Sequence, residues 1–253
     1  MKDEDLYAAI FKRKSVRNFD LTALDQNVLD EIWQKLGSLE PMSPDIKTEF
    51  KIVPSEKVST RIMKRAPHYV AAFSEAKGAY ASNVGFLLQQ MDLYFSASGF
   101  GSCWQGIPRP AKDVVESSNL EFVILMAFGN PSETLHRASA SEFKRKPLSE
   151  ITDIQGADEL LEPARLAPSA VNRQNWYFTG DKTVVHAYSF KPGFLRNLLE
   201  GKYFPINVGI AMYHLQLAAK HFGRKATVVF EEEKEKNPTR DRDYIASLKI
   251  ENP

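Results

Sequence analysis

The sequence has a single cysteine, Cys103, among its 253 residues. One cysteine cannot form a disulfide within the chain, and this scarcity favours a reducing compartment. No run approaches the roughly 18 consecutive apolar residues of a membrane-spanning helix, and no apolar stretch of signal-peptide length follows the acidic start Met1–Asp5. We therefore expect a cytoplasmic protein with no membrane partner.

An excess of charge of either sign is also absent. Lys and Arg number 33 against 32 Asp and Glu, and the formal net charge is +1. Such a chain has no global field to recruit nucleic acid, and aromatic residues do not interleave with its basic clusters. We expect no nucleic-acid partner, and any bound anion must be held by a local cluster.

Several catalytic and metal-binding patterns are missing as well. The five histidines lack metal-ligand spacing, and His214 and His221 lie two helical turns apart, too far for one metal. No Walker loop, Gly-x-Gly-x-x-Gly or Gly-x-Ser-x-Gly motif occurs. Cys103 sits in an apolar, Gly-rich stretch without a His or Lys partner, so we expect it to be packed. No metal site is predicted.

The hydrophobic fraction, 43%, is that of an ordinary globular protein with a substantial core. Apolar residues at helical spacing predict helices around residues 6–10, 29–36, 84–95 and 160–164. Alternating or continuous apolar runs predict strands at 49–53, 122–128, 184–185 and 227–230. The charge-dense segment 231–243 is predicted to be a solvated helix end or a mobile loop.

One segment of the chain echoes another. At a shift of 124 residues, the stretch from Asn83 to Gly99 matches the stretch from Asn207 to Gly223 at five of seventeen positions. Both stretches open with Asn-Val-Gly and end in Gly, and similar elements flank them. A duplication is the favoured interpretation; one domain with two similar helices is the other.

A basic cluster, Arg13-Lys14-Ser15-Val16-Arg17, follows the first predicted helix. Guanidinium, ammonium and hydroxyl groups at a helix end provide charge-assisted donors for a phosphate. A solvated basic surface or a short nucleic-acid patch would have the same composition. The cluster alone therefore does not decide between these interpretations.

A polar loop, Pro168-Ser169-Ala170-Val171-Asn172-Arg173-Gln174-Asn175-Trp176, lies far downstream. A Pro-Ser turn exposes backbone and hydroxyl groups, and Asn172 and Gln174 carry amides that donate and accept hydrogen bonds. Such groups can recognise the edge of a uracil-like ring. The alternative is an ordinary loop whose amides satisfy their own backbone, with Trp176 in the core.

Together these two segments resemble motifs of the nitroreductase family of FMN-dependent oxidoreductases. The first is similar to the family's Arg-x-Ser-x-Arg motif, and the resemblance implies that Arg13, Lys14, Ser15 and Arg17 bind the phosphate and ribityl chain of FMN. The second resembles Ala-Pro-Ser-x-x-Asn-x-Gln-Pro-Trp and implies flavin contacts from Pro168, Ser169, Ala170, Asn172 and Gln174. Asn175 replaces the family's proline, which is expected to loosen the loop.

Two further stretches fit the same resemblance. The segment Gly99–Gly106 is similar to the family segment whose backbone amides approach the reactive edge of the isoalloxazine, with Gln105 and Gly106 as the candidates. Arg145 resembles a basic residue that family members place on the phosphate. For Arg145 an exposed connector residue is the other reading.

The resemblance also explains why the two motifs are so far apart. Family members are homodimers in which each flavin lies between subunits and takes one motif from each. Here the first half keeps Arg-x-Ser-x-Arg but has Glu40–Pro44 in place of the second motif, and the second half shows the reverse. We expect an α+β, nitroreductase-like fold of two tandem related units, residues 1–150 and 151–253, packed as an intrachain pseudo-dimer. Such a chain would act as a monomer.

The implied activity is transfer of a hydride from NAD(P)H through FMN to a small-molecule acceptor such as a nitroaromatic or a quinone. The flavin would carry the chemistry, so no catalytic acid or base is predicted in the chain. A flavin- or ligand-binding protein without turnover, such as a redox sensor or a degenerate relative, is the alternative.

Overall fold

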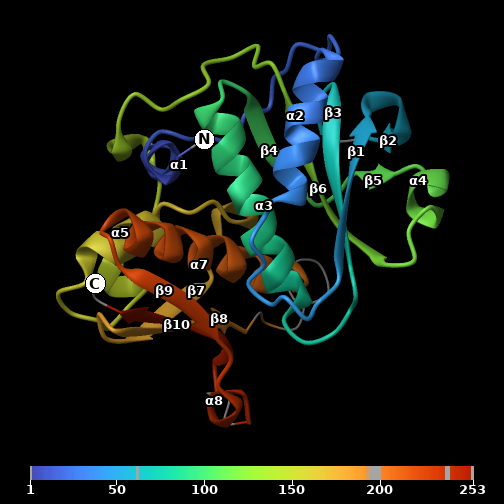
Figure 1. Cartoon of the computed structure of the whole chain (residues 1–253). Helices are drawn as coiled ribbons and strands as arrows, with labels where there is room; N and C mark the ends of the chain where they lie inside the picture. Colours follow the sequence, from blue (N-terminus) through green and yellow to red (C-terminus); the bar gives the residue numbers. More distant parts are fainter. Residues whose placement is uncertain (1, 61–62, 192, 194–200, 237–239, 252–253) are drawn as a thin grey trace.

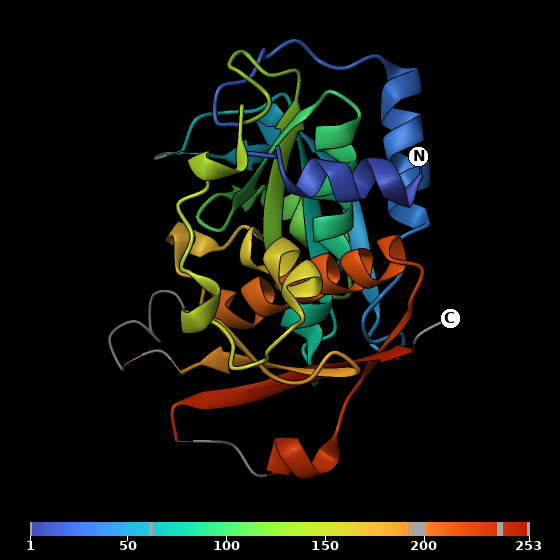
Figure 2. The same ribbon diagram turned by 90° about the vertical axis from the view of Figure 1, so that its left-hand side faces the viewer.

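A computed structural model describes residues 2–60, 63–191, 193, 201–236 and 240–251. Two four-stranded sheets lie on either side of a central pair of long helices, α3 (Tyr80–Ala97) and α7 (Tyr203–His221). Figure 1 shows the first sheet in the upper part of the molecule and the second in the lower part, and Figure 2 gives the same arrangement from the side. The helix pair thus separates two α+β units.

The two sheets have the same topology. The first contains β1 (Thr48–Pro54), β3 (His68–Ser74), β4 (Gly101–Gln105) and β6 (Glu121–Gly129) in the order β1-β3-β6-β4. The second contains β7 (Trp176–Gly180), β8 (Val184–Phe190), β9 (Lys225–Val229) and β10 (Arg242–Glu251) in the order β7-β8-β10-β9. Neighbouring strands are antiparallel throughout, and the long helix follows the second strand of each unit. The predicted pair of tandem related units is therefore confirmed.

Shorter elements complete each unit. The first has α1 (Asp3–Ile10), α2 (Gln26–Gly37), α4 (Lys112–Glu116) and a small ribbon of β2 (Val58–Ser59) with β5 (Arg109–Pro110). The second has α5 (Asp158–Arg165), which contains Pro163, and α8 (Glu232–Lys236). Thr152 already pairs with Phe178 of β7. This pairing agrees with a boundary near residue 150, which stays a prediction.

Burial explains the sequence patterns of the strands. Alternate residues of β6 enter two different apolar clusters, Ile124 and Met126 on one face and Leu125 and Ala127 on the other. A strand buried on both faces needs a continuous apolar run, as the stretch 122–128 has. In contrast, β8 alternates buried Val185 and Ala187 with partly exposed neighbours, because only one face of the second sheet meets the core.

The segment 231–243 differs in part from the prediction. Residues 232–236 form α8, as a solvated helix would, and Arg242 and Asp243 already belong to β10; residues 237–239 lie outside the described part. The inner strand β10 was not predicted. Charged residues at its start obscure the apolar pattern of the strand in the sequence, although Ala246, Leu248 and Ile250 are buried in the core.

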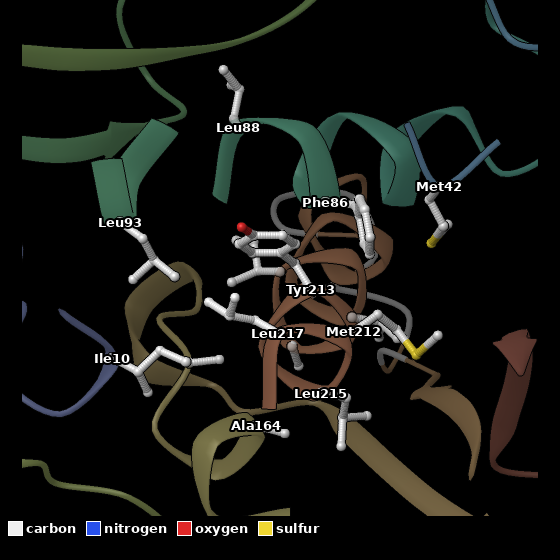
Figure 3. Packing of buried hydrophobic residues seen from close by; sticks show 14 of the residues in the cluster. Ile10, Met42, Phe86, Leu88, Leu93, Ala164, Met212, Tyr213, Leu215 and Leu217 are labelled. Atoms are coloured by element: carbon white, nitrogen blue, oxygen red, sulfur yellow. The ribbon is translucent and has the colours of Figure 1, made fainter. Parts of the chain in front are cut away.

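One apolar core spans both units. It includes Ile10 of α1, Phe86 of α3, and Tyr213 and Leu217 of α7 (Figure 3). The rings of Phe86 and Tyr213 meet edge to face with centroids 5.3 Å apart. The described residues therefore form one folded body, since neither unit has this core to itself.

The long helices cross at two glycines. A side chain on Gly85 would overlap the carbonyl group of Ile206, and one on Gly209 would overlap the carbonyl group of Ser82. The shift of 124 residues seen in the sequence maps one contact onto the other, because Gly85 corresponds to Gly209 and Ser82 to Ile206. The crossing is therefore self-complementary in the manner of a two-fold dimer interface. The glycines permit the close approach because they lack a Cβ.

Substituting Gly209 tests this crossing. Gly209→Ala forces the two helix backbones apart, and we expect it to lower the free energy of unfolding by about 2 kcal/mol or more through overpacking. Gly37→Ala, at the end of α2 where an added Cβ meets nothing within 4 Å, is the matched control and should be neutral or slightly stabilising. Urea denaturation of both variants measures the difference; equal stabilities would contradict a close crossing.

Candidate functional site

The first basic segment is fastened along strand β4. Ser15 forms an isolated parallel bridge with Ser102, and the Val16 N–H donates to the Ser102 carbonyl at 2.9 Å. Val16 is fully buried against Gly101, where a Cβ would collide with it. This anchoring turns Lys14 and Arg17 away from the core.

Arg13 faces the other way. Its side chain is 1% exposed, and Nε lies 2.9 Å from Asp92 Oδ2 on α3. The other carboxylate oxygen, Oδ1, accepts a hydrogen bond of 2.6 Å from the Ser102 hydroxyl. A buried arginine without this carboxylate would be strongly destabilising. The ion pair therefore locks the start of the segment onto the central helix pair.

The same network continues across both long helices. Gln89 Nε2 donates to Asp92 Oδ2 at 3.1 Å and lies 2.9 Å from His214 Nε2 on α7. His214 Nδ1 lies 2.8 Å from the Pro163 carbonyl of α5. Because a carbonyl can only accept, Nδ1 carries the hydrogen and Nε2 accepts from Gln89. Burial, with the charges of Arg13 and Arg145, lowers the pKa of His214 to about 3 although the Pro163 bond opposes it, so the ring is neutral.

The polar loop begins directly after α5. Its backbone is left-handed at Val171, Asn172 and Gln174, with φ of 45°, 57° and 49°. Left-handed φ is a strained conformation for a β-branched residue such as Val171. Strain of this kind persists only where surrounding contacts fix the backbone.

Asn207 of α7 supplies two of these contacts. Its Oδ1 accepts from the Ala170 N–H at 2.9 Å and its Nδ2 donates to Asn175 Oδ1 at 2.6 Å. Asn175 is buried and donates in turn to the Ser189 hydroxyl and the Phe204 carbonyl. The expectation that Asn175 loosens the loop is therefore wrong: this side chain ties the loop to β8 and α7, which proline could not do.

The first unit repeats the arrangement around Asn83. Its Oδ1 accepts from the Ser43 N–H at 3.0 Å, and its Nδ2 donates to Thr48 Oγ1 at 3.3 Å. Ser43 thus corresponds to Ala170 and Thr48 to Asn175. Residues 40–44 do occupy the place of the second motif in the first unit, as the sequence indicated.

A cationic cavity of about 430 Å³ opens between the two segments. Six basic side chains line it, opposed there by Glu133 and Glu142: Arg13, Lys14, Arg17, Arg137, Lys144 and Arg145. Lys14 pairs with Glu133 at 3.2 Å. Partial burial would raise the pKa of Glu133, but the Arg17 and Asn18 N–H groups and the Lys14 ammonium lower it to about 2. The cavity keeps an excess of positive charge.

Arg145 carries much of this excess. It donates to the carbonyls of Leu166 and Ala167 and, at 2.6 Å, to Asn172 Oδ1, all neutral acceptors. Burial and the neighbouring charges of Arg13, Arg137 and Arg165 lower the pKa of Arg145 to about 9. Arg137 donates to the Arg13 carbonyl and lies over the Phe143 ring at 4.0 Å. An anion here would relieve the mutual repulsion of these guanidinium groups.

A second, mostly apolar cavity of about 410 Å³ adjoins the cationic one. The two share Ser15, Arg17, Pro168, Ser169 and Val171. Its other walls include Ile124, Ile206 and Ile210, with Ile107 and Val171 exposed at 63% and 73%. Trp104 lines it, and the buried indole Nε1 has no hydrogen-bond partner within the described residues. A cationic and an apolar cavity in contact suit a ligand with an anionic end and a flat ring.

Most residues predicted from the sequence meet at these cavities. The cationic cavity collects Arg13, Lys14, Ser15, Arg17, Arg145, Pro168, Ser169 and Asn172, and the apolar cavity adds Gly106 and Ala170. Gln105 and Gln174 line neither. Gln105 is buried with an unpartnered Oε1, and Gln174 Oε1 accepts from the Lys146 N–H at 2.7 Å.

Other lining residues were missed by sequence reasoning. Arg137 reaches the cavity because the neighbouring residue His136 forms an isolated β-bridge with Arg13. No local sequence motif indicates this position. Tyr203, at the start of α7, packs against Gly106 and donates a hydrogen bond of 2.6 Å to its carbonyl. Cys103 lines the apolar cavity, but burial raises the pKa of its thiol, which agrees with a packed residue.

No cluster of three or more potential metal ligands occurs among the described residues. Nor does any helix in that part of the chain have the length and apolar character to cross a membrane.

One family model matches most of the chain. A family model described as "Putative TM nitroreductase" matches residues 5–219. A solved structure from Thermotoga maritima, titled a putative nitroreductase, is 23% identical, covers 100% of this chain and 96% of its own, and superposes with a TM-score of 0.68. This likeness shows the shared fold over the whole chain.

Structures that match only part of the chain are more distant. One from Clostridium difficile, titled an FMN-dependent nitroreductase, is 14% identical, covers 57% of this chain and 100% of its own, and has a TM-score of 0.45. None of the curated proteins matches this sequence.

The buried histidine makes a pH prediction. The unfolded chain protonates His214 near pH 6.5, whereas the folded protein resists protonation down to about pH 3. The stability that depends on neutral His214 is therefore present above pH 6.5 and is lost as the pH falls toward 3. In His214→Gln, the slope of unfolding free energy against pH between 6 and 4 should be shallower by up to about 1.4 kcal/mol per pH unit.

Denaturant unfolding at several pH values measures both slopes. The variant's lower stability at pH 7 does not affect the comparison, because the slope and not the absolute value is compared. His68, His136 and His186, whose pKa values are also lowered by burial, and Glu133, whose pKa is lowered to about 2, contribute to the slope that remains. An unchanged slope would show that His214 is not held neutral.

Proposed function

Because this chain belongs to the family described as "Putative TM nitroreductase", we propose that it is an FMN-dependent oxidoreductase using NAD(P)H. The observation that carries the proposal is the joined pair of cavities at the seam between the two units. When bound, FMN supplies two-electron transfer between a reduced nicotinamide and an acceptor such as a nitroaromatic or a quinone.

The cationic cavity fits a phosphate monoester. Such a group carries a charge of roughly −1.5 to −2 near neutral pH. Within the described part of the chain, Arg17, Arg137 and Arg145 have no carboxylate partner in an ion pair, and all three line the cavity. We assign these three arginines and Lys14 to the phosphate. Arg13 anchors the basic segment 13–17 to α3 through Asp92.

Two hydroxyl groups lie where the cavities meet. Ser15 Oγ accepts from Arg13 at 3.2 Å and Ser169 Oγ accepts from the Gln174 N–H at 3.0 Å. Each hydroxyl therefore keeps its own hydrogen to donate. We assign Ser15 and Ser169 to the polyol chain that joins phosphate and ring. Asn172 and Gln174 hold the loop and Arg145 in place and so act as positioning residues.

The apolar cavity fits the ring system. Pro168 and Ala170 line it, and so does Gly106, whose missing Cβ makes room for the Tyr203 ring. The Tyr203 hydroxyl orients the Gly106 peptide through its carbonyl, and Gln105 supports the same strand end from the protein interior. The exposed apolar rim of Ile107 and Val171 would receive a flat acceptor.

Phosphate recognition is tested by comparing two flavins. Arg17 is exposed, so Arg17→Gln leaves the packing of the fold unchanged while removing one charge from the cavity. We expect FMN affinity to fall about ten- to a hundredfold, the effect of losing one charged hydrogen bond, and riboflavin affinity to stay within a factor of about three.

Fluorescence titration of each flavin gives both affinities, with Lys249→Gln on the exposed face of β10 as the charge-matched control. If FMN and riboflavin affinities fell together, or if neither changed, the assignment of this cavity to the phosphate would be wrong.

Turnover is tested separately from binding. Adding NADH or NADPH to the flavin-loaded protein under anaerobic conditions should bleach the flavin absorbance, and a nitroaromatic or quinone should restore it. Stopped-flow absorbance measures both phases. A flavin that binds but is not bleached would identify a binding protein without turnover and would contradict the enzyme assignment.

A further inference from the structure

The two-fold relation between the units predicts a second position equivalent to the apolar cavity. A cavity of about 600 Å³ lies there, lined by residues that include Ser43, Ala79 and Ser82. At the shift of 124 residues, Ala79 corresponds to Tyr203 and Ser82 to Ile206, both in the wall of the first cavity. Ser43 corresponds to Ala170 through the matching asparagine contacts.

This second cavity differs chemically from the first. The basic residues that line it are Lys77 and Lys202, in contrast to the arginine cluster beside the first cavity. Asp45 takes the place that Asn172 has in the second unit. The Ser43 hydroxyl, which donates to Asp45 at 2.7 Å, lowers the pKa of this carboxyl, with smaller contributions from its own N–H and from Lys77. An ionised carboxylate at this position disfavours a phosphate dianion, so the cavity does not suit FMN.

The N-terminus of α3 opens into the cavity. Its N-cap is Ala79, which has no side chain that could cap the helix. The hydrogen bonds among the described residues leave the N–H groups of Ala81 and Ser82 without an acceptor. Free N–H groups at the positive end of a helix dipole attract an anion.

Ser82 provides an independent indication of a ligand. Its side chain is 1% exposed, it lines the cavity, and its hydroxyl has no hydrogen-bond partner in the described structure. Leaving a buried hydroxyl unpaired costs about 1–3 kcal/mol. Ile206, its counterpart in the first cavity, has no such group.

Charge and shape narrow the ligand class. Lys77 pairs with Glu75 at 3.0 Å, whereas the Lys202 ammonium lies 4.9 Å from the centre of the Tyr203 ring and has no carboxylate partner among the described residues. Phe230 and Ile245 add apolar walls. One free cation, a helix end and a hydroxyl, opposed by the Asp45 carboxylate, favour a single negative charge over a double one, carried on an apolar body.

We propose that this second cavity binds a small monocarboxylate with an aromatic ring. The carboxylate takes hydrogen bonds from the Ala81 and Ser82 N–H groups, the Ser82 hydroxyl and Lys202, and the ring lies against Phe230 and Ile245. The site is separate from the flavin cavities, and its occupancy does not depend on bound FMN.

Benzoate is the probe that tests this proposal. Isothermal titration calorimetry uses the full chain saturated with FMN, which occupies the cationic and apolar cavities, and should give one benzoate site. Ser82→Ala and Lys202→Met should each weaken benzoate about tenfold, while thermal unfolding shows that both variants fold. Inorganic phosphate should not displace benzoate.

Two controls separate this site from the first. Arg17→Gln and Lys249→Gln should leave benzoate affinity unchanged. The proposal is overturned if the FMN-saturated protein binds no benzoate at millimolar concentration, or if Ser82→Ala binds benzoate as the original protein does. Failure of FMN to bind at all would overturn the flavin proposal but leave this one standing, because Ser82→Ala and Lys202→Met would still identify the benzoate bound in the second cavity.

Discussion

The architecture depends on the close crossing of α3 and α7. Gly85 and Gly209 let each helix touch the backbone of the other, and the reciprocal contact fixes a two-fold relation between the units. Each sheet packs against this pair, and both loops that precede the first strands are fastened to it by Asn83 and Asn207. Two equivalent cavities follow from that geometry, as they would at the interface of a homodimer. Because the units are joined, selection can change one cavity without changing the other.

A buried polar chain links the crossing to the functional segments. It runs from Arg13 through Asp92 and Gln89 to His214 and ends at the Pro163 carbonyl, just before the polar loop. Every hydrogen bond of this chain lies in the low-dielectric interior. There, hydrogen bonds and ion pairs are strong, and an unpaired polar group lowers the stability of the fold. The two motifs that are far apart in the sequence are thereby held at one site by buried side chains, of which only Arg13 also lines the cationic cavity. Asp92 neutralises the buried Arg13. The excess positive charge of the cavity therefore comes from its other basic side chains.

The sequence predicted much of this arrangement for identifiable reasons. The repeated asparagine and glycine were visible because each has one structural task, anchoring a loop or permitting the helix crossing, that other residues perform poorly. Most of the residues that the two motifs nominated likewise line the two cavities. Strand β10 was missed because charged residues precede its buried face, and Gln174 was assigned to the ligand because its partner, Lys146, is distant in sequence. Arg137 and Tyr203 enter the site only through tertiary contacts, which no local pattern encodes.

The central claim is that one chain contains one complete flavin site made from both of its halves. Native mass spectrometry of the protein reconstituted with excess FMN tests this claim most directly, because it counts chains and flavins in the same particle. We expect a single chain carrying one FMN. Two FMN molecules on one chain, or FMN found only on particles of two chains, would contradict it.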